Sequence, residues 1–418
     1  MTPLQKTRGG LSLTALKRWR PGALAQASME LTGWFFLRAA AQAITILALA
    51  KVLGATDYGA FVAVLAITGI SASVAGLGSP SVVLRDGARQ PLELPSLLGR
   101  ALCTWWRSVL LFTLATSAIV QVVLPPIDAP GFAIHGMILT EIASISLIEL
   151  LGRAFQAQKN TRAYGAMQAG LPLARLLALV ALWGAGHHDL TAWLCVYIAA
   201  SIGYMVSATW FTHRQVGWQP SSRDTWAMIR EGIPFTAGGV SARLQAEYNK
   251  PLLAQAAFAH AGNFNIAQRA VDLVSLPILA MQEALWPRLY ADADHRRRLM
   301  IAGIILVLMS LAGAAVVIAG ASLVPVILGE EFRTASELMV WLALLPLFAV
   351  LRSLGNFQLI ATARTHLLTW VYLIGGLAGI VFSTLLIPRH GMLGAAWACY
   401  ATEAIALFTI LVLLKATD

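Results

Sequence analysis

The sequence predicts an all-α polytopic membrane protein with about 12 transmembrane helices. Three observations predict this fold class. The 418 residues are 58% hydrophobic and only 12% charged, and their mean hydropathy is +0.71. The apolar residues form long segments, each near the ~20 residues that cross a bilayer as a helix. These segments are continuous runs and lack the alternation typical of barrel strands.

Each expected span is one of these apolar runs, and polar or charged residues separate it from the next. In the first half of the chain we expect spans at 31–53, 57–77, 97–123, 132–152, 163–184 and 189–211. In the second half we expect them at 233–257, 263–286, 299–320, 335–360, 366–387 and 392–414. The longest polar stretches are the N-terminal segment and residues 212–232. No sizeable soluble domain fits beside these spans.

The basic residues predict the orientation, because they sit on alternate connections between spans. The rich set of connections contains Lys17, Arg20, Arg85, Arg89, Arg153, Lys159, Arg214, Arg223, Arg230, Arg288, Arg364 and Lys415. The poor set contains Lys51, Arg333 and Arg389. Lys and Arg are retained in cytoplasmic loops, so the rich set lies in the cytoplasm. Both termini are then cytoplasmic, which requires an even number of spans.

The orientation has a direct test. A topology reporter fused after Ser222 is expected to be active in the cytoplasm, because Arg214, Arg223 and Arg230 flank that position. A reporter fused after Asp128 is expected to lie outside. The opposite readings at the two positions would contradict the span order.

The chain divides near its middle into two predicted halves. Leu53–Ala60 closes the first span and opens the second, and Ala259–Ile266 does the same for spans seven and eight, so that Tyr58 corresponds to Phe264. Six spans in each half give both halves the same orientation, which predicts a pseudo-two-fold axis normal to the membrane. We expect a basic cytoplasmic segment at 1–30, a six-helix bundle at 31–211, a cytoplasmic linker at 212–232 and a second six-helix bundle at 233–418.

Several function classes lack support in the sequence. There is no phosphate-binding P-loop, no HExxH motif and no nucleophile elbow, which argues against an enzyme. Cys103, Cys195 and Cys399 lie within spans and form no metal-ligand pattern, so we expect neither a metal nor a cofactor. The net charge of +10 is distributed over alternate loops, which indicates membrane orientation rather than binding to nucleic acid.

Charged residues inside the membrane are costly and usually face a cavity or a partner. Span one carries Trp34, Arg38 and Gln42 at a spacing of four, on one helix face. We interpret this face as a cavity wall that binds an anion. The alternative is that Arg38 reaches the inner headgroups with its long side chain.

Span seven carries Arg243, Glu247 and Lys250 at positions i, i+4 and i+7. Each cation can pair with Glu247 along the helix. Because the three lie near the middle of a span, we interpret them as lining a cavity. The alternative is an ion-pair ladder buried for a structural purpose.

The remaining polar residues within spans extend the cationic set. Further candidates for contact with an anion are Arg175 near Gln168 in span five, Arg269 in span eight, and Arg352 with Asn356 in span ten. Asp272 lies three residues from Arg269, and we expect Glu247 and Asp272 to orient the cations. Glu141 and Glu403 are isolated carboxyls; either they couple transport to a proton or sodium gradient, or they are hydrogen-bonded packing groups.

Ordered motifs reveal a family resemblance. The pattern Arg38, Gln42, Leu53-Gly-Ala-Thr-Asp57-Tyr58-Gly59, Gly76-Leu77-Gly78 and Arg85 resembles the opening of Wzx-type polysaccharide flippases. Asn263–Ala270, Leu276-Pro277, Trp286-Pro287 and Leu328–Phe332 are similar to motifs of their second half. These flippases belong to the MATE-like superfamily that also contains multidrug exporters and the lipid II flippase.

The resemblance implies a substrate. It implies a flippase that moves a polyprenyl-diphosphate-linked oligosaccharide to the periplasmic leaflet by alternating access, for O-antigen or exopolysaccharide biosynthesis. A cationic interior agrees with a diphosphate headgroup. One alternative is a multidrug cation antiporter, which favours acidic cavity residues. The other is a lipid II flippase, whose two further C-terminal spans are missing here.

The resemblance also implies the setting. The expected location is the bacterial inner membrane, with many spans and both termini in the cytoplasm. The expected partners are the lipid-linked oligosaccharide, membrane lipids and, in the same pathway, a polysaccharide polymerase and chain-length proteins. No nucleic acid is expected.

Overall fold

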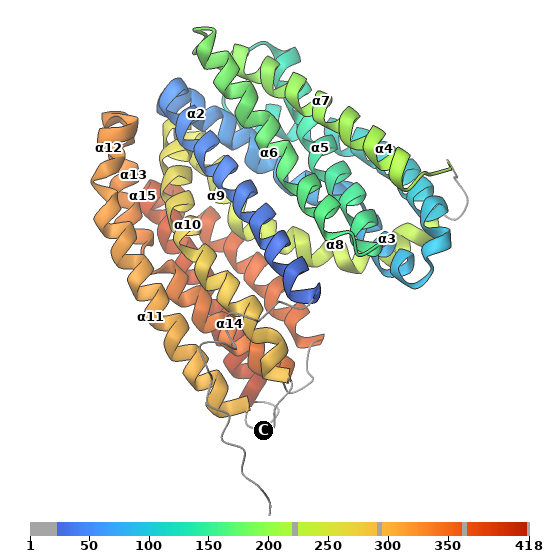
Figure 1. The fold of residues 1–418 in the computed structure, drawn as a ribbon. Coiled ribbons are helices and arrows are strands. Elements are labelled where there is room, and N and C mark those ends of the chain that lie inside the picture. The colour runs from blue at the N-terminus through green and yellow to red at the C-terminus, as the bar shows by residue number, and fades with distance from the viewer. Residues whose placement is uncertain (1–22, 220–224, 291–294, 362–365, 416–418) are drawn as a thin grey trace, which may run out of the picture.

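The computed structural model describes residues 23–219, 225–290, 295–361 and 366–415. Most of the predicted basic segment 1–30 and the middle of the predicted linker 212–232 lie outside these residues. No strand occurs in the described part of the chain. The predicted all-α fold is therefore confirmed, and Figure 1 shows long helices packed side by side.

The helices follow the predicted spans closely. The first half contains α2 (Ala23–Ala75), α3 (Ser79–Arg89), the short 3-10 helix η1 (Pro91–Glu93), α4 (Leu94–Val123), α5 (Gly131–Ala157), α6 (Thr161–Gly184) and α7 (Leu190–Gln215). The second half contains α8 (Thr225–Glu247), α9 (Asn249–Ala256), α10 (Phe258–Tyr290), α11 (His295–Ala321), α12 (Leu323–Leu328), η2 (Glu330–Phe332), α13 (Arg333–Leu342), α14 (Leu345–Ala361) and α15 (His366–Lys415).

Glycine kinks join two pairs of predicted spans into single long helices. Gly54 in α2 has φ 74° and Gly391 in α15 has φ 57°. Glycine adopts a positive φ readily, because glycine lacks a Cβ atom. The predicted loops after the first and eleventh spans are therefore sharp kinks.

The count of spans agrees with the prediction. Within the described residues, eight helical segments are long and apolar enough to cross a membrane. Two of them, 29–89 and 370–415, each contain two predicted spans, so the eight account for ten predicted spans. The other two predicted spans, the seventh and eighth, coincide with α8–α9 and α10. A count of about 12 is consistent with this arrangement.

Two predicted spans are each divided between two helices. Span seven divides between α8 and α9, and Pro251 lies in the first turn of α9. Span ten divides between α13 and α14, and Pro346 follows the first residue of α14. Proline lacks an amide hydrogen and suits the first turn of a helix, which explains both restarts.

Helix α2 lies at the centre of the packing. It contacts α5 and α6 of the first half and α8, α9 and α10 of the second, and Figure 1 shows it beside α10 and α6. Tyr58 of α2 and Phe264 of α10 are both fully buried, and Asn265 Nδ2 donates a hydrogen bond of 2.5 Å to Tyr58 Oη. The apolar core is thus continuous between the first and second halves. The boundaries and symmetry axis of the two bundles stay predictions.

Backbones of the two halves touch at glycines near both ends of the second stretch of α2. A Cβ atom at Gly59 would lie 1.8 Å from the carbonyl oxygen of Phe258 in α10. A Cβ atom at Gly78 would lie 1.9 Å from the carbonyl oxygen of Gly232 in α8. Any larger side chain at either glycine would force the helices apart.

Polar contacts accompany both glycine contacts. Near Gly59, the backbone nitrogen of Ala55 donates a 3.1 Å hydrogen bond to Glu331 Oε2. Near Gly78, Arg85 forms an ion pair with Glu231. Each pair joins residues far apart in the sequence.

Candidate functional site

Five charged side chains of α8, α9 and α10 form a cluster centred on Glu247. We call Arg243, Glu247, Lys250, Arg269 and Asp272 the α8–α10 cluster. Lys250 Nζ lies 2.5 Å from Glu247 Oε2, Arg243 Nη1 lies 3.8 Å from Glu247 Oε1, and Arg269 Nη2 lies 3.9 Å from the same oxygen. Arg269 Nη1 lies 3.4 Å from Asp272 Oδ2. The pairings expected from the sequence spacing are confirmed, although α8 ends at Glu247.

The α8–α10 cluster carries excess positive charge. It holds three cations and two carboxylates, which leaves one positive charge unmatched. The side chains of Arg243 and Arg269 are 46% and 42% exposed, whereas that of Lys250 is 2% exposed. An anion would therefore meet the two guanidinium groups. Lys250, a predicted anion contact, is buried against Glu247 in this conformation.

Arg38 extends this charged region across to the first half. Its Nη1 atom donates a 2.8 Å hydrogen bond to Gln168 Oε1 of α6, and its guanidinium interacts electrostatically with Arg243. Trp34, one turn earlier, packs so closely on α6 that a Cβ atom at Gly165 would lie 2.4 Å from its ring. Gln42 is exposed. The face predicted for span one thus places Arg38 in electrostatic range of Arg243, and Trp34, on the same face of α2, packs against α6.

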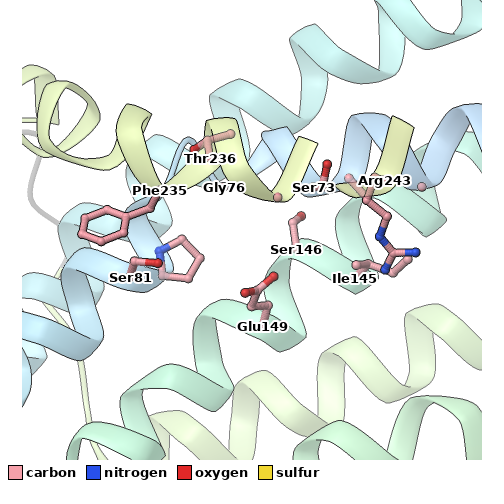
Figure 2. A pocket seen from close by; sticks show the side chains of 14 residues that line it. Ser73, Gly76, Ser81, Ile145, Ser146, Glu149, Phe235, Thr236 and Arg243 are labelled. Atoms are coloured by element: carbon pink, nitrogen blue, oxygen red, sulfur yellow. The ribbon is translucent and has the colours of Figure 1, made fainter. Parts of the chain in front are cut away.

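A cavity of about 220 Å³ adjoins Arg243. We call it the α5–α8 cavity, since α5 and α8 contribute its charged groups, Glu149 and Arg243, while α2 and the start of α3 complete it. Hydroxyl groups line it from several sides, as Figure 2 shows for Ser73, Ser146 and Thr236. Because α2 and α5 belong to the first half and α8 to the second, the cavity lies between the halves.

Arg175 is held in a separate network in the first half. Its Nη2 atom lies 2.6 Å from Glu141 Oε2 and 3.0 Å from Ser144 Oγ. Its Nε atom donates to Ser201 Oγ at 3.1 Å, and its guanidinium lies 4.1 Å from the ring centre of Tyr197, which itself donates to Glu141. The expectation that Glu141 is an isolated carboxyl is wrong, because α5, α6 and α7 bring these groups together.

Arg352 is likewise neutralised, in the second half. Its Nε and Nη2 atoms lie 2.6 Å and 3.3 Å from the two carboxylate oxygens of Glu403 in α15. The expectation that Glu403 is isolated is therefore also wrong. Asn356, one turn further along α14, is buried, and its Oδ1 atom has no hydrogen-bond partner among the described residues. The roles of Glu141 and Glu403 in ion coupling stay predictions.

The structure adds residues that the sequence did not single out as candidates. Glu149 forms the 3.5 Å pair with Arg153 that its spacing allows, yet it also lines the α5–α8 cavity. The other additions are Phe235 and the hydroxyl residues of that cavity. The sequence could have indicated Glu149, because it is a carboxylate within predicted span four. Serines and a phenylalanine within apolar helices carry no signal of their own.

Comparison with known families identifies the family of this chain. The family described as "Polysaccharide biosynthesis protein" matches residues 29–291, which is more than half of the chain. The chain belongs to this family. The resemblance to polysaccharide flippases is thereby confirmed at the level of family. No curated protein matches the sequence.

Solved structures that are similar to this chain confirm the MATE-like fold. The lipid II flippase MurJ, in an inward closed conformation, has a TM-score of 0.75 at 12% identity, over 92% of this chain and 87% of that chain. An inward-facing multidrug resistance MATE family transporter has a TM-score of 0.68 at 12% identity, over 91% and 94%. A MOP superfamily transporter from Pyrococcus furiosus Vc1, described by a binding pocket of reverse polarity, has a TM-score of 0.61 at 14% identity, over 92% and 93%. At these identities the likeness shows the fold alone.

Proposed function

We infer that this polysaccharide biosynthesis protein is a flippase for a polyprenyl-diphosphate-linked oligosaccharide, which it moves from the cytoplasmic to the periplasmic leaflet of a bacterial inner membrane. The family match and the fold support the general activity. The observation that carries the substrate class is the excess positive charge of the α8–α10 cluster, with two partly exposed guanidinium groups, of which that of Arg243 lines a cavity between the halves.

The chemistry of the diphosphate matches this arrangement. A guanidinium group donates two parallel hydrogen bonds to phosphate oxygens, and it is more weakly hydrated than an ammonium group. Arg243 and Arg269 are the partly exposed cations of the cluster, and Arg38 lies in electrostatic range of Arg243. Together they would offset the cost of moving a diphosphate into the membrane interior. The lipid tail would remain in the bilayer.

A multidrug cation antiporter is the alternative that the fold leaves open. Such a transporter requires a site that attracts cations. The α8–α10 cluster has one cation in excess of its carboxylates, and the carboxylates of Glu141 and Glu403 are paired with arginines. These charges favour an anionic substrate.

Reconstitution of the full chain in liposomes tests the proposal. A fluorescent polyprenyl-diphosphate oligosaccharide is placed in both leaflets, and a membrane-impermeant reductant bleaches the molecules that reach the outer leaflet. With the protein present, we expect bleaching of both leaflets; empty liposomes should keep the inner population protected. The controls are a neutral glycolipid with the same tail and a cationic dye. Protection of the diphosphate substrate together with transport of the dye would contradict the proposal and favour the antiporter.

A further inference from the structure

The α5–α8 cavity presents hydrogen-bond acceptors to a ligand. The Ser73 hydroxyl donates its hydrogen to the carbonyl oxygen of Ile70 at 2.6 Å, and the Ser146 hydroxyl donates to that of Ile142 at 2.5 Å. Because these hydroxyl hydrogens are already donated, the two oxygens can only accept from a ligand, and Ser146 also accepts from Trp105 Nε1 at 2.8 Å. Glu149 adds a carboxylate, which when ionised only accepts.

Such a lining selects a ligand rich in donors. A sugar ring carries several hydroxyl groups that donate, whereas a carboxylate or phosphate offers only acceptors. The ring of Phe235, which is 51% exposed, borders the same cavity in Figure 2 and offers an apolar face to the C–H groups of a sugar. The cavity thus combines the two kinds of contact that a sugar ring can make.

The size of the cavity fits one sugar unit. Its volume of about 220 Å³ is below the ~300–1,000 Å³ of pockets that enclose drug-sized ligands. A complete oligosaccharide would not fit, and a single ring is the natural occupant. The several glycines in its wall, including Gly69, Gly76 and Gly239, keep the space open.

Arg243 connects this cavity to the α8–α10 cluster. Its side chain lines the cavity, and its Nη1 atom lies 3.8 Å from Glu247 of the cluster. A diphosphate held by Arg243 would therefore place the sugar that is bonded to it at the mouth of the α5–α8 cavity. The donor-rich guanidinium meets the phosphates, and the acceptor-rich cavity meets the sugar.

We propose that the α5–α8 cavity is the subsite for the sugar bonded directly to the diphosphate, and that Glu149 makes it select an uncharged sugar over a uronic acid. The proposal rests on the proposed function, because the diphosphate at Arg243 brings the sugar to the cavity. Glu149 accepts a hydrogen bond from a sugar hydroxyl and repels a sugar carboxylate. Its pairing with Arg153 is loose, at 3.5 Å with the Glu149 side chain 47% exposed, and leaves the carboxylate free to do so.

Three synthetic probes separate the subsite from the diphosphate site. They are a polyprenyl diphosphate without sugar, the same lipid bearing one glucose, and the same lipid bearing one glucuronic acid. Dissociation constants are measured on the full chain in nanodiscs. We expect the glucosyl lipid to bind about tenfold more tightly than the bare diphosphate, the gain of one charge-assisted hydrogen bond. We expect the glucuronosyl lipid to bind no more tightly than the bare lipid.

Two variants test whether Glu149 causes the selectivity for an uncharged sugar. Glu149→Gln keeps the shape and removes the charge, so it should bind the two glycosylated lipids within about twofold of each other. Phe235→Ala should weaken the glucosyl lipid and leave the bare diphosphate unchanged. Glu330→Gln is the matched control, since the Glu330 side chain is 80% exposed in a pair with Arg333; it should behave as the wild type.

The outcomes distinguish the two proposals. If the bare diphosphate does not bind the wild type, both the proposed function and the subsite are overturned. If it binds but glucose adds no affinity, or if Glu149→Gln keeps the full discrimination, the sugar subsite is overturned while the diphosphate site stands.

Discussion

Replacing Arg243 with alanine is expected to abolish translocation of the lipid-linked oligosaccharide. Arg243 lies at the junction of the α8–α10 cluster and the α5–α8 cavity, and its side chain is 46% exposed and lines that cavity. Each hydrogen bond to a charged group contributes about 1.5–3 kcal/mol, so loss of the guanidinium should weaken binding of the diphosphate by about 10- to 100-fold. Two quantities check this prediction: the translocation rate in liposomes and the dissociation constant of the diphosphate lipid.

Lysine at the same position refines this prediction. Arg243→Lys keeps the charge but loses the planar fork that contacts two phosphate oxygens, so it should restore only part of the activity. Arg38→Ala and Arg269→Ala should each reduce translocation as well. Arg333→Ala is the control: this side chain is 74% exposed and pairs with Glu330. Wild-type export in the triple alanine variant of Arg38, Arg243 and Arg269 would refute the anion site.

Arg175→Leu is expected to cause the largest loss of stability among these substitutions. It leaves the carboxylate of Glu141, a side chain only 6% exposed, without its cation. Removing one partner of a buried ion pair typically costs about 3–5 kcal/mol, because the remaining charge is uncompensated. The free energy of unfolding, or the melting temperature of the protein in detergent, measures the loss.

A second substitution separates charge from packing. Glu141→Gln in the Arg175→Leu background removes the unpaired charge and should recover most of the lost stability. Arg162→Leu is the control on the same helix, since Arg162 is 81% exposed and lies 3.9 Å from Glu30; it should change stability by less than about 1 kcal/mol. If Arg175→Leu were as mild as Arg162→Leu, the Glu141 network would not be a stabilising element.

Local spacing explains what the sequence could predict. The helices follow from apolar runs of bilayer length, and glycine and proline explain where they kink or restart. Within the site, Arg243, Glu247 and Lys250 lie three or four residues apart, as do Arg269 and Asp272. Residues at that spacing meet on one helix face whatever surrounds the helix, and Glu247 and Lys250 also meet across the break between α8 and α9. These pairings could therefore be predicted from the sequence alone.

Ion pairs between different helices could not be predicted from the sequence. Arg175 and Glu141 lie 34 residues apart, and Arg352 and Glu403 lie 51 residues apart. Nothing in a single sequence indicates which carboxylate meets which arginine when helices pack. Both carboxylates therefore looked isolated, and both arginines looked available to a ligand. The α5–α8 cavity was hidden for the same reason, since three helices and the start of α3 form its wall.

The glycine contacts at Gly59 of α2 and at Gly78, the N-cap of α3, would affect how fast the two halves could separate. Interlocked side chains must change rotamers before helices part, whereas backbones that touch at Gly59 and Gly78 have no such steps to complete. Polar contacts add to the packing at both ends: the Ala55 hydrogen bond to Glu331 beside Gly59, and the ion pair of Arg85 with Glu231 near Gly78. The Arg85 and Glu231 side chains are 35% and 52% exposed. Dissolved salt therefore weakens the Arg85 end, and the barrier to opening that end falls as ionic strength rises.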